Sequence, residues 1–443
     1  MLSAGFSKVC ISPPIGAPLA GFAARQGMCE GIHDDLFSRA LVIEKDGNAV
    51  AFVSLDVLAV SSEFVGRVRE NIRRRTGIKK EAVMIAATHT HAGPVTVRTF
   101  FNPDGMLDKD YMERLAKAVE DSVAEAFDKK FPARVGVGSG YVSGIGVNRR
   151  TEDKKPIDEE IGIIKVEDLS GETRGVFINY ACHPTVLGSN NLLATGDFPY
   201  FTVEKIEQSV GGFAMFVNGT QGNISMGHSS ELSAIGIITP GRTFEHAEEL
   251  GNKLADAALA ALPSIETAEN AAISAVTIPF PFPLKKYPPP AETAQAMQKT
   301  EEYLQTLNAS NERNADELDK LLRAKSAALY ASIENFYAVE TEKFTDRVME
   351  VELQGIRVGD AVFIAVPAEV FVEIGLQLKK RAPQKTYIVG IANGYIGYLP
   401  TDEAYKIGGY EVVSARCAEE THELLIDKAI ELEKQLFGET IAA

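Results

Sequence analysis

The sequence predicts an α/β fold: a mixed-sheet α/β core with functional side chains at strand ends and an inserted helical hairpin. Strand-like and helix-like patterns alternate over the first 135 residues, which is typical of an α/β core. The alternation returns from residue 134 onward, and a charged, helix-prone stretch at 291–345 interrupts it. We expect one catalytic-type domain over residues 1–443, with a connector and helical insertion at 278–345 inside it.

Turn and cap residues define the elements of the first part. "GFSKVCIS" is expected as the first strand, ended by Pro13 and Pro14. "ALVIEK" and "AVAFVSLDVLAV" flank "DGN", which predicts a hairpin whose second strand runs past Asp56. "SSEFVGRVRENIRRRTG" has an N-cap serine and a glycine stop, so it predicts a helix. The strand "AVMIAAT" and the amphipathic helix "DKDYMERLAKAVEDSVAEAF" follow.

The second part has the same kinds of element. Expected strands are "RVGVGSGYVSG", "EIGIIKVED", "RGVFINYACHP" and "GFAMFVNGT", and expected helices are "YFTVEKIEQSV" and "RTFEHAEELGNKLADAALAAL". "IPFPFPLKKYPPP" at 278–290 predicts a proline-rich connector, followed by a helical hairpin with a break at "NASNERN". The hairpin is either a solvated arm or a lid over a site. The α/β pattern then resumes and ends in the helix "EETHELLIDKAIELEKQLF".

Composition excludes several classes of protein. The formal net charge of −16 disfavours non-specific binding to nucleic acid. The sequence contains no run of about 18 apolar residues, so it predicts no transmembrane helix. The four cysteines are scattered, which suits free thiols in a reducing compartment. We identify no signal peptide at the N-terminus, so we expect a cytoplasmic protein. The pattern gives no prediction of oligomeric state.

Three of the seven histidines share one context. His89, His91 and His183 each follow an apolar strand, where ligands bind in open α/β sheets. Two histidines one residue apart on an extended chain point the same way, so both could reach one metal ion, or one could bind it while the other transfers a proton. The alternative is a pair of turn histidines bonded to backbone, and "THTH" by itself does not decide between these readings.

Other polar residues near strand ends allow two readings each. Asp56 and Asp197 could orient a ligating imidazole, or could cap backbone N–H groups in tight turns. Ser225, in "QGNIS", could be a nucleophile, a hydrogen-bond donor or a helix N-cap, and the pattern favours the cap. Glu369 and Tyr398, together with Tyr395, follow strands and could be structural.

Taken together, these segments resemble the neutral/alkaline, non-lysosomal ceramidase family. The matching segments occur in the family's order over nearly the whole chain, and their combination is specific although no single one is. They are "ATHTHAGP", "VNRR", "YACHPTVLGSNNLLATGD", "QGNIS", "VPAEVF" and "NGYIGYLPTDEAY".

The resemblance implies a mononuclear zinc (Zn²⁺) amidohydrolase. It assigns His89, His183, Glu369 and Tyr398 as zinc ligands. It also implies that His91 is a site histidine near the metal, Arg149 a polar anchor for substrate, and Ser225 an active-site serine facing the scissile amide. Zinc commonly takes nitrogen and oxygen ligands in four-coordinate sites, which agrees with this set.

The sequence departs from the family's pattern in three places. Asn223 stands where the family has Asp, Met226 where it has Pro, and Ala368 where it has Gly. Family members also carry a C-terminal β-sandwich domain, and we expect this chain to be a short member without it.

The expected function is hydrolysis of a linear amide, in an N-acyl lipid such as a sphingolipid or in a smaller N-acyl compound. Metal-activated water would attack, and His91 would protonate the leaving nitrogen. One alternative is a metal-dependent ester or phosphoester hydrolase, since Arg149 and Arg150 would suit an anionic substrate. The other is a catalytically silent ligand-binding homologue, for which the changes at Asn223 and Met226 give some support.

Overall fold

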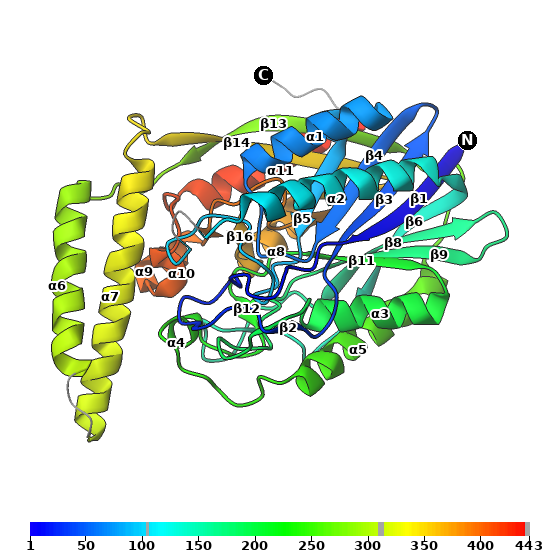
Figure 1. Ribbon diagram of the computed structural model, residues 1–443. Coiled ribbons are helices and arrows are strands. Elements are labelled where there is room, and N and C mark those ends of the chain that lie inside the picture. Colours follow the sequence, from blue (N-terminus) through cyan, green and yellow to red (C-terminus); the bar gives the residue numbers. More distant parts are fainter. Residues whose placement is uncertain (103–105, 309–313, 439–443) are drawn as a thin grey trace.

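The computed structural model describes residues 1–102, 106–308 and 314–438, and its centre is an eight-stranded mixed sheet (Figure 1). The strand order is β11-β9-β8-β6-β1-β3-β4-β5. The strands are β1 (Leu2–Cys10), β3 (Phe37–Lys45), β4 (Asn48–Leu55), β5 (Val83–Ala87), β6 (Phe131–Tyr141), β8 (Glu160–Asp168), β9 (Thr173–Tyr180) and β11 (Phe213–Asn218). The middle pairs are antiparallel, and each edge strand pairs parallel with its neighbour. The predicted mixed α/β sheet is confirmed.

Two similar units make up this sheet. In each, a hairpin leads through a helix to a parallel edge strand: β3-β4 leads through α1 (Ser62–Thr76) to β5, and β8-β9 leads through α3 (Phe198–Val210) to β11. Helix α2 (Lys109–Asp128) packs on β1 and β3, whereas α5 (Phe244–Ala261) packs on α3 and β6. The two edges approach each other, since Asn218 Nδ2 donates to the Thr88 carbonyl oxygen at 2.6 Å.

A second, four-stranded sheet packs against the first. It contains β13 (Ile273–Pro283), β14 (Val348–Val358), β15 (Ala361–Ala365) and β17 (Lys385–Val389), with α8 (Val372–Arg381) and α11 (Thr421–Phe437) beside it. The prediction of a connector from residue 278 is therefore wrong over 278–283, which pair with β14 in register. Prolines are tolerated here because β13 is an edge strand with a free side.

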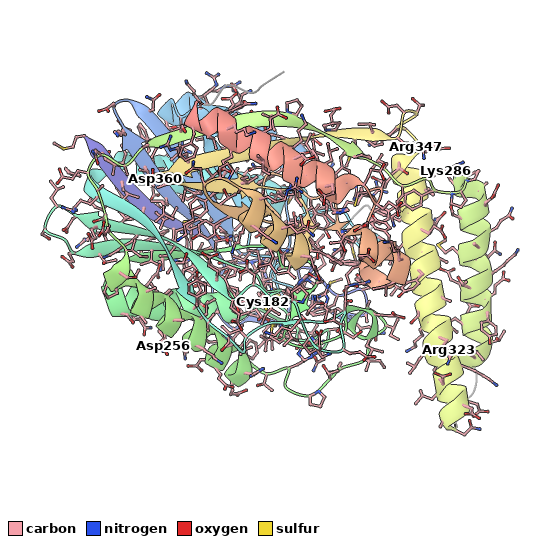
Figure 2. The ribbon with its side chains drawn as sticks, turned by 180° about the vertical axis from the view of Figure 1, so that it is seen from behind. Cys182, Asp256, Lys286, Arg323, Arg347 and Asp360 are labelled. Atoms are coloured by element: carbon pink, nitrogen blue, oxygen red, sulfur yellow. The ribbon has the colours of Figure 1, made fainter. Side chains whose placement is uncertain are left out.

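The inserted helical hairpin is confirmed. Helices α6 (Pro290–Asn308) and α7 (Ala315–Thr341) pack against each other and project from the rest of the molecule (Figure 1). Lys286 and Arg347 mark the points where the chain enters and leaves this arm (Figure 2). The predicted break at "NASNERN" lies mostly outside the described residues. The base of α7 is anchored, because Tyr337 Oη donates to the Ser414 carbonyl oxygen at 3.0 Å.

Short elements line the region between the sheets. They are β2 (Gly31–Ile32), β7 (Val147–Asn148), β10 (Leu193–Ala194), β12 (Ile224–Ser225), α4 (Ser230–Ala234), β16 (Glu369–Val370), β18 (Tyr398–Leu399), α9 (Asp402–Ile407) and α10 (Tyr410–Val413). Over the three described ranges, no helix has the length and apolar character needed to cross a bilayer.

We expect Phe363→Ala to destabilise the fold by about 3–5 kcal/mol, the usual cost of deleting a buried aromatic ring. Phe363, on β15, is fully buried and its ring lies 5.2–5.6 Å from those of Phe52 and Phe177 on the first sheet. Urea denaturation followed by circular dichroism measures the change. Val339→Ala, at an exposed position on α7, is the control. An unchanged midpoint for Phe363→Ala would mean that this aromatic contact does not hold the sheets together.

Candidate metal centre

His89 lies on a tight turn directly after β5. Its backbone φ is +68°, a left-handed conformation that costs a non-glycine residue about 1–3 kcal/mol. The turn is held because the N–H groups of Thr88 and His89 donate to the carbonyl oxygens of Leu55 and Val57. The expectation that His89 and His91 align through extended-chain alternation is therefore wrong. The rings still converge, with centroids 5.0 Å apart.

Backbone carbonyl groups set the orientation of two imidazole rings. His89 Nδ1 donates to the Leu58 carbonyl oxygen at 2.7 Å, and His183 Nδ1 donates to that of Gln221 at 2.7 Å. A carbonyl oxygen only accepts, so each Nδ1 carries the proton and each neutral ring has a lone pair on Nε2. Both rings are buried, and both Nε2 atoms are left to face the interior of the site.

The carboxylate of Glu369 meets both of these Nε2 atoms. Its Oε2 lies 2.9 Å from His183 Nε2 and 3.4 Å from His89 Nε2, and its Oε1 accepts a hydrogen bond from Tyr395 Oη at 2.7 Å. Burial favours the neutral carboxyl, but the positive charge that the rings of His89 and His183 carry when protonated outweighs burial and holds the pKa of Glu369 well below its usual range. When both rings are neutral, their Nε2 lone pairs repel the Glu369 carboxylate unless a metal cation lies between them.

His91 completes a cluster of three histidines. Its two ring nitrogens are buried and have no hydrogen-bond partner in the described parts of the chain. One nitrogen from each of His89, His91 and His183 lies within 4.8 Å of the others. Burial, reinforced by the charges of His89 and His183, lowers the pKa of His91 well below its usual value, so the neutral ring is favoured.

A second hydrogen-bonded group borders the histidines. Glu369 and Tyr398 are opposite each other in the short parallel pair β16–β18. Arg149 donates through Nη2 to Tyr398 Oη at 3.1 Å and through Nε to Glu411 at 2.8 Å. Arg150 donates to the other oxygen of Glu411 at 2.6 Å. Since both arginines share this buried carboxylate, they give no support to the argument that they suit an anionic substrate.

Asp56 and Asp197 do not orient the histidines. Asp56 follows the end of β4, where its Oδ2 accepts from the backbone N–H of Phe37 at 2.9 Å. Asp197 caps α3, accepting from the N–H of Phe198 at 2.7 Å and from two further backbone N–H groups. Of the two readings, the one in which these carboxylates orient ligating rings is not supported, and the capping reading is correct for Asp197. Burial raises the pKa of both carboxyl groups to about 6.

The histidine cluster lies between two small lobes of a cavity. The polar lobe, of about 40 Å³, is lined by Arg149, His183, His228, Ser230 and Arg242 among others. The aromatic lobe, of about 30 Å³, is lined by residues that include Leu58, Phe100, Phe101, Phe336 and Tyr337. Gly21, His91, Tyr398 and Tyr410 border both lobes. Helix α7 of the arm therefore contributes to the wall of the site.

Residues 4–224 match the sequence profile of the N-terminal part of neutral/alkaline non-lysosomal ceramidase. The chain belongs to the neutral/alkaline non-lysosomal ceramidase family. The neutral ceramidase of Drosophila melanogaster is 22% identical, over 97% of this chain and 74% of that protein. Neutral ceramidase 2 of Arabidopsis thaliana is 28% identical, over 42% of this chain and 27% of that protein.

The fold is that of a solved member of the family. The crystal structure of neutral ceramidase from Pseudomonas aeruginosa matches with a TM-score of 0.75 and 18% identity, covering all of this chain and 75% of that one. The match extends over both sheets, so it includes the strands and loops that carry the histidines and Glu369.

Ser225 lies near the histidine cluster but lines neither lobe of the cavity. It is in strand β12, paired with Val147, so the expectation that it caps a helix is wrong; Ser229 is the N-cap of α4. Its buried Oγ donates to the His228 carbonyl oxygen at 3.1 Å. Neither lobe includes Ser225 among the described residues that line it.

The departures from the family pattern near Ser225 have structural partners. Asn223 Nδ2 donates to both carboxylate oxygens of Glu373, at 2.8 and 3.1 Å, and its Oδ1 accepts from the Val372 N–H. An aspartate would repel Glu373 at this position. Met226 Sδ lies 3.4 Å from Cys182 Sγ. Cys182 lies in the interior of the molecule (Figure 2).

Sequence reasoning missed several residues of the site. Leu58 supplies a carbonyl group rather than a side chain, and Tyr410, His228 and Arg242 lie outside the segments singled out. His228 carried one available signal, because it follows Ser225 by three residues at the end of a buried strand.

Asn223→Asp is expected to lower stability by about 1–3 kcal/mol, because it replaces a donor to Glu373 with a second carboxylate. The loss should be larger at pH 8 than at pH 5, since repulsion requires both carboxylates to be ionised. Thermal melting measures it, and Glu373→Gln in the same background should restore much of the loss. Equal melting temperatures for wild type and Asn223→Asp at pH 8 would contradict the role assigned to this pair.

Proposed function

We propose that the protein is a zinc-dependent hydrolase that cleaves a linear amide bond, in an N-acyl lipid or in a smaller N-acyl compound. One observation carries the proposal: Glu369 Oε2 lies within 3.4 Å of two buried imidazole nitrogens whose opposite nitrogens are fixed as donors. Family membership supports amide hydrolysis as the class of reaction.

The residues present fit a zinc ion. Two oriented Nε2 atoms, a buried carboxylate and a phenol form a nitrogen and oxygen donor set of the kind zinc takes. His89, His183, Glu369 and Tyr398 would hold the ion, and the buried ring nitrogens of His91, which have no partner among the described residues, fit a bound group beside them. A bound zinc ion supplies a Lewis acid for the carbonyl oxygen and lowers the pKa of a bound water to about 7.

The surrounding residues would position substrate and move a proton. An amide nitrogen leaves poorly unless it is protonated, and His91 borders both lobes where that nitrogen would lie. Arg149 holds Tyr398 through its guanidinium, and Glu411 holds Arg149 in turn. Ser225 remains the candidate serine that would contact the amide, once its hydroxyl releases the His228 carbonyl group.

Two alternative functions would use the same metal-binding residues but differ in the reaction that follows substrate binding. An ester or phosphoester hydrolase would use the same donor set on another bond. A silent homologue would bind ligand without turnover. Hydrolysis of N-acyl compounds of graded chain length, measured with and without chelator, separates the three. Chelator-sensitive release of a free amine supports the proposal, whereas phosphodiester cleavage alone or binding without turnover contradicts it.

Elemental analysis of protein purified without added metal should give one zinc per chain. His183→Ala should lose most of this zinc, because it removes a nitrogen ligand and leaves Glu369 without its 2.9 Å partner. His246→Ala, which removes a surface histidine on α5, is the matched control. Full zinc occupancy in His183→Ala would refute the ligand set.

His91→Ala should reduce kcat by about 10²–10⁴-fold while retaining zinc, as expected for loss of a proton-transfer group. Zinc content and kcat are measured on the same preparation. Loss of zinc together with activity would instead make His91 a third histidine ligand, for which its ring is also close enough.

A further inference from the structure

The polar lobe contains a guanidinium that no carboxylate neutralises. Arg242 donates to the carbonyl oxygens of Thr185 and Leu187 and to the Ser233 hydroxyl, and all these partners are neutral. No carboxylate of the described residues lies within 4.0 Å of its nitrogens, and burial lowers its pKa to about 10. Arg242 is partly buried, and the charge of the more distant Asp197 carboxylate offsets only part of its lost hydration.

A second arginine lies nearby in the same condition. Arg25 donates to the carbonyl oxygens of Ala20 and His91, and it forms no ion pair with the described carboxylates. Arg25 and Arg242 both lie against the ring of Phe22, with guanidinium carbons 5.1 and 5.9 Å from its centroid. By contrast, Arg149 and Arg150 both form ion pairs with Glu411. Arg242 lines the polar lobe without such an ion pair, although the chain as a whole carries a net charge of −16.

His228 lies at the end of a chain of hydrogen bonds that begins at Arg242. Arg242 Nε donates to Thr239 Oγ1 at 3.3 Å, and Thr239 Oγ1 lies 2.6 Å from His228 Nδ1. In the tautomer in which the Thr239 hydroxyl donates to Nδ1, the neutral ring carries its proton on Nε2 and can donate it into the lobe. This Nε2 is buried, lines the lobe and has no partner among the described residues, while only 9% of the His228 residue surface is exposed.

We propose that Arg242 and His228 form a subsite for a carboxylate carried by the substrate, so that this protein favours small N-acyl amino acids over neutral amides. The inference rests on the proposed amide hydrolysis and names its substrate class. A carboxylate accepts the His228 Nε2–H and provides the ion-pair partner that Arg242 lacks. The scissile amide then lies at His91, between this subsite and the aromatic lobe.

The sizes of the two lobes agree with a compact substrate. A volume of about 40 Å³ holds roughly three water molecules at about 10–15 Å³ each, enough for a carboxylate group. The aromatic lobe, lined by Phe100, Phe101 and Phe336, suits an apolar acyl group.

The test compares two probes of the same shape. N-hexanoylglycine carries a carboxylate where N-hexanoylglycinamide carries a neutral carboxamide. We expect the kcat/KM of the wild-type protein to be about tenfold or more higher for the carboxylate, since a hydrogen bond to a charged group contributes about that factor. Calorimetric titration of both probes in the presence of chelator, where no turnover occurs, gives the same preference as a binding ratio.

Variants assign the preference to the subsite. Arg242→Gln and His228→Leu should each reduce the carboxylate-to-carboxamide ratio toward one, whereas Arg242→Lys should retain part of it. His228→Leu keeps the assignment testable if Arg242→Gln fails to fold. Arg416→Gln removes a positive charge from the aromatic lobe, and Arg323→Gln removes one from the exposed surface of the arm. Both should retain the wild-type ratio.

The outcomes separate this inference from the proposed function. Equal binding and equal turnover of the two probes overturn the subsite and leave amide hydrolysis intact. A loss of preference in Arg416→Gln, with none in Arg242→Gln or His228→Leu, also overturns it. A binding preference without hydrolysis of either probe supports the subsite and contradicts the proposed function.

Discussion

The contact of the Glu369 carboxylate with His89 and His183 connects the two halves of the molecule. The histidines follow β5 and β9 of the eight-stranded sheet, and the carboxylate lies on β16, which follows β15 of the four-stranded sheet in the chain and pairs with β18. All three groups are at most 2% exposed. A carboxylate this deeply buried is tolerated only with an opposite charge and satisfied hydrogen bonds, so the packing of the two sheets and the chemistry of the site impose the same requirement.

The backbone prepares this contact before any ligand binds. The Leu58 and Gln221 carbonyl groups fix the tautomers of the two rings, and each comes from a loop after a strand of the large sheet. His89 has a strained, left-handed backbone conformation in the turn that presents its ring. The hydrogen bond from Asn218 Nδ2 to the Thr88 carbonyl oxygen, which joins the two sheet edges, stabilises this turn. Strain of about 1–3 kcal/mol in a non-glycine residue persists only where neighbours determine the geometry.

The sequence predicts local structure and strand-end positions well because both depend on short-range patterns. The N-cap Ser61, the Gly77 stop and the hairpin at "DGN" are examples, and so is the placement of His89 and His183 after strands. What failed depends on contacts distant in the chain. Asp56 bonds to Phe37 rather than to a histidine, and residues 278–283 pair with β14 despite three prolines, because only the tertiary fold makes β13 an edge strand.

The roles of the arginines illustrate why charge in a site cannot be predicted from sequence proximity. Arg149 and Arg150 are adjacent in the chain and look like an anion-binding pair, but both form ion pairs with Glu411, 262 residues from Arg149. Arg242 has no acidic partner in the described chain and draws its whole hydrogen-bond set from neutral oxygens. The effective charge of a guanidinium in a cavity depends on which carboxylates the fold brings within about 4 Å, where the interaction is strongest.

The arm adds a further constraint, because it forms part of the wall of the aromatic lobe. Phe336 and Tyr337 of α7 face this lobe, and Tyr337 Oη fixes the helix to the loop after α10. Removing water from a cleft of this size strengthens every interaction among the histidines, Glu369 and Arg149, because the local dielectric constant falls. An insertion that lies outside both sheets thus contributes to the low-dielectric surroundings in which the buried charges act.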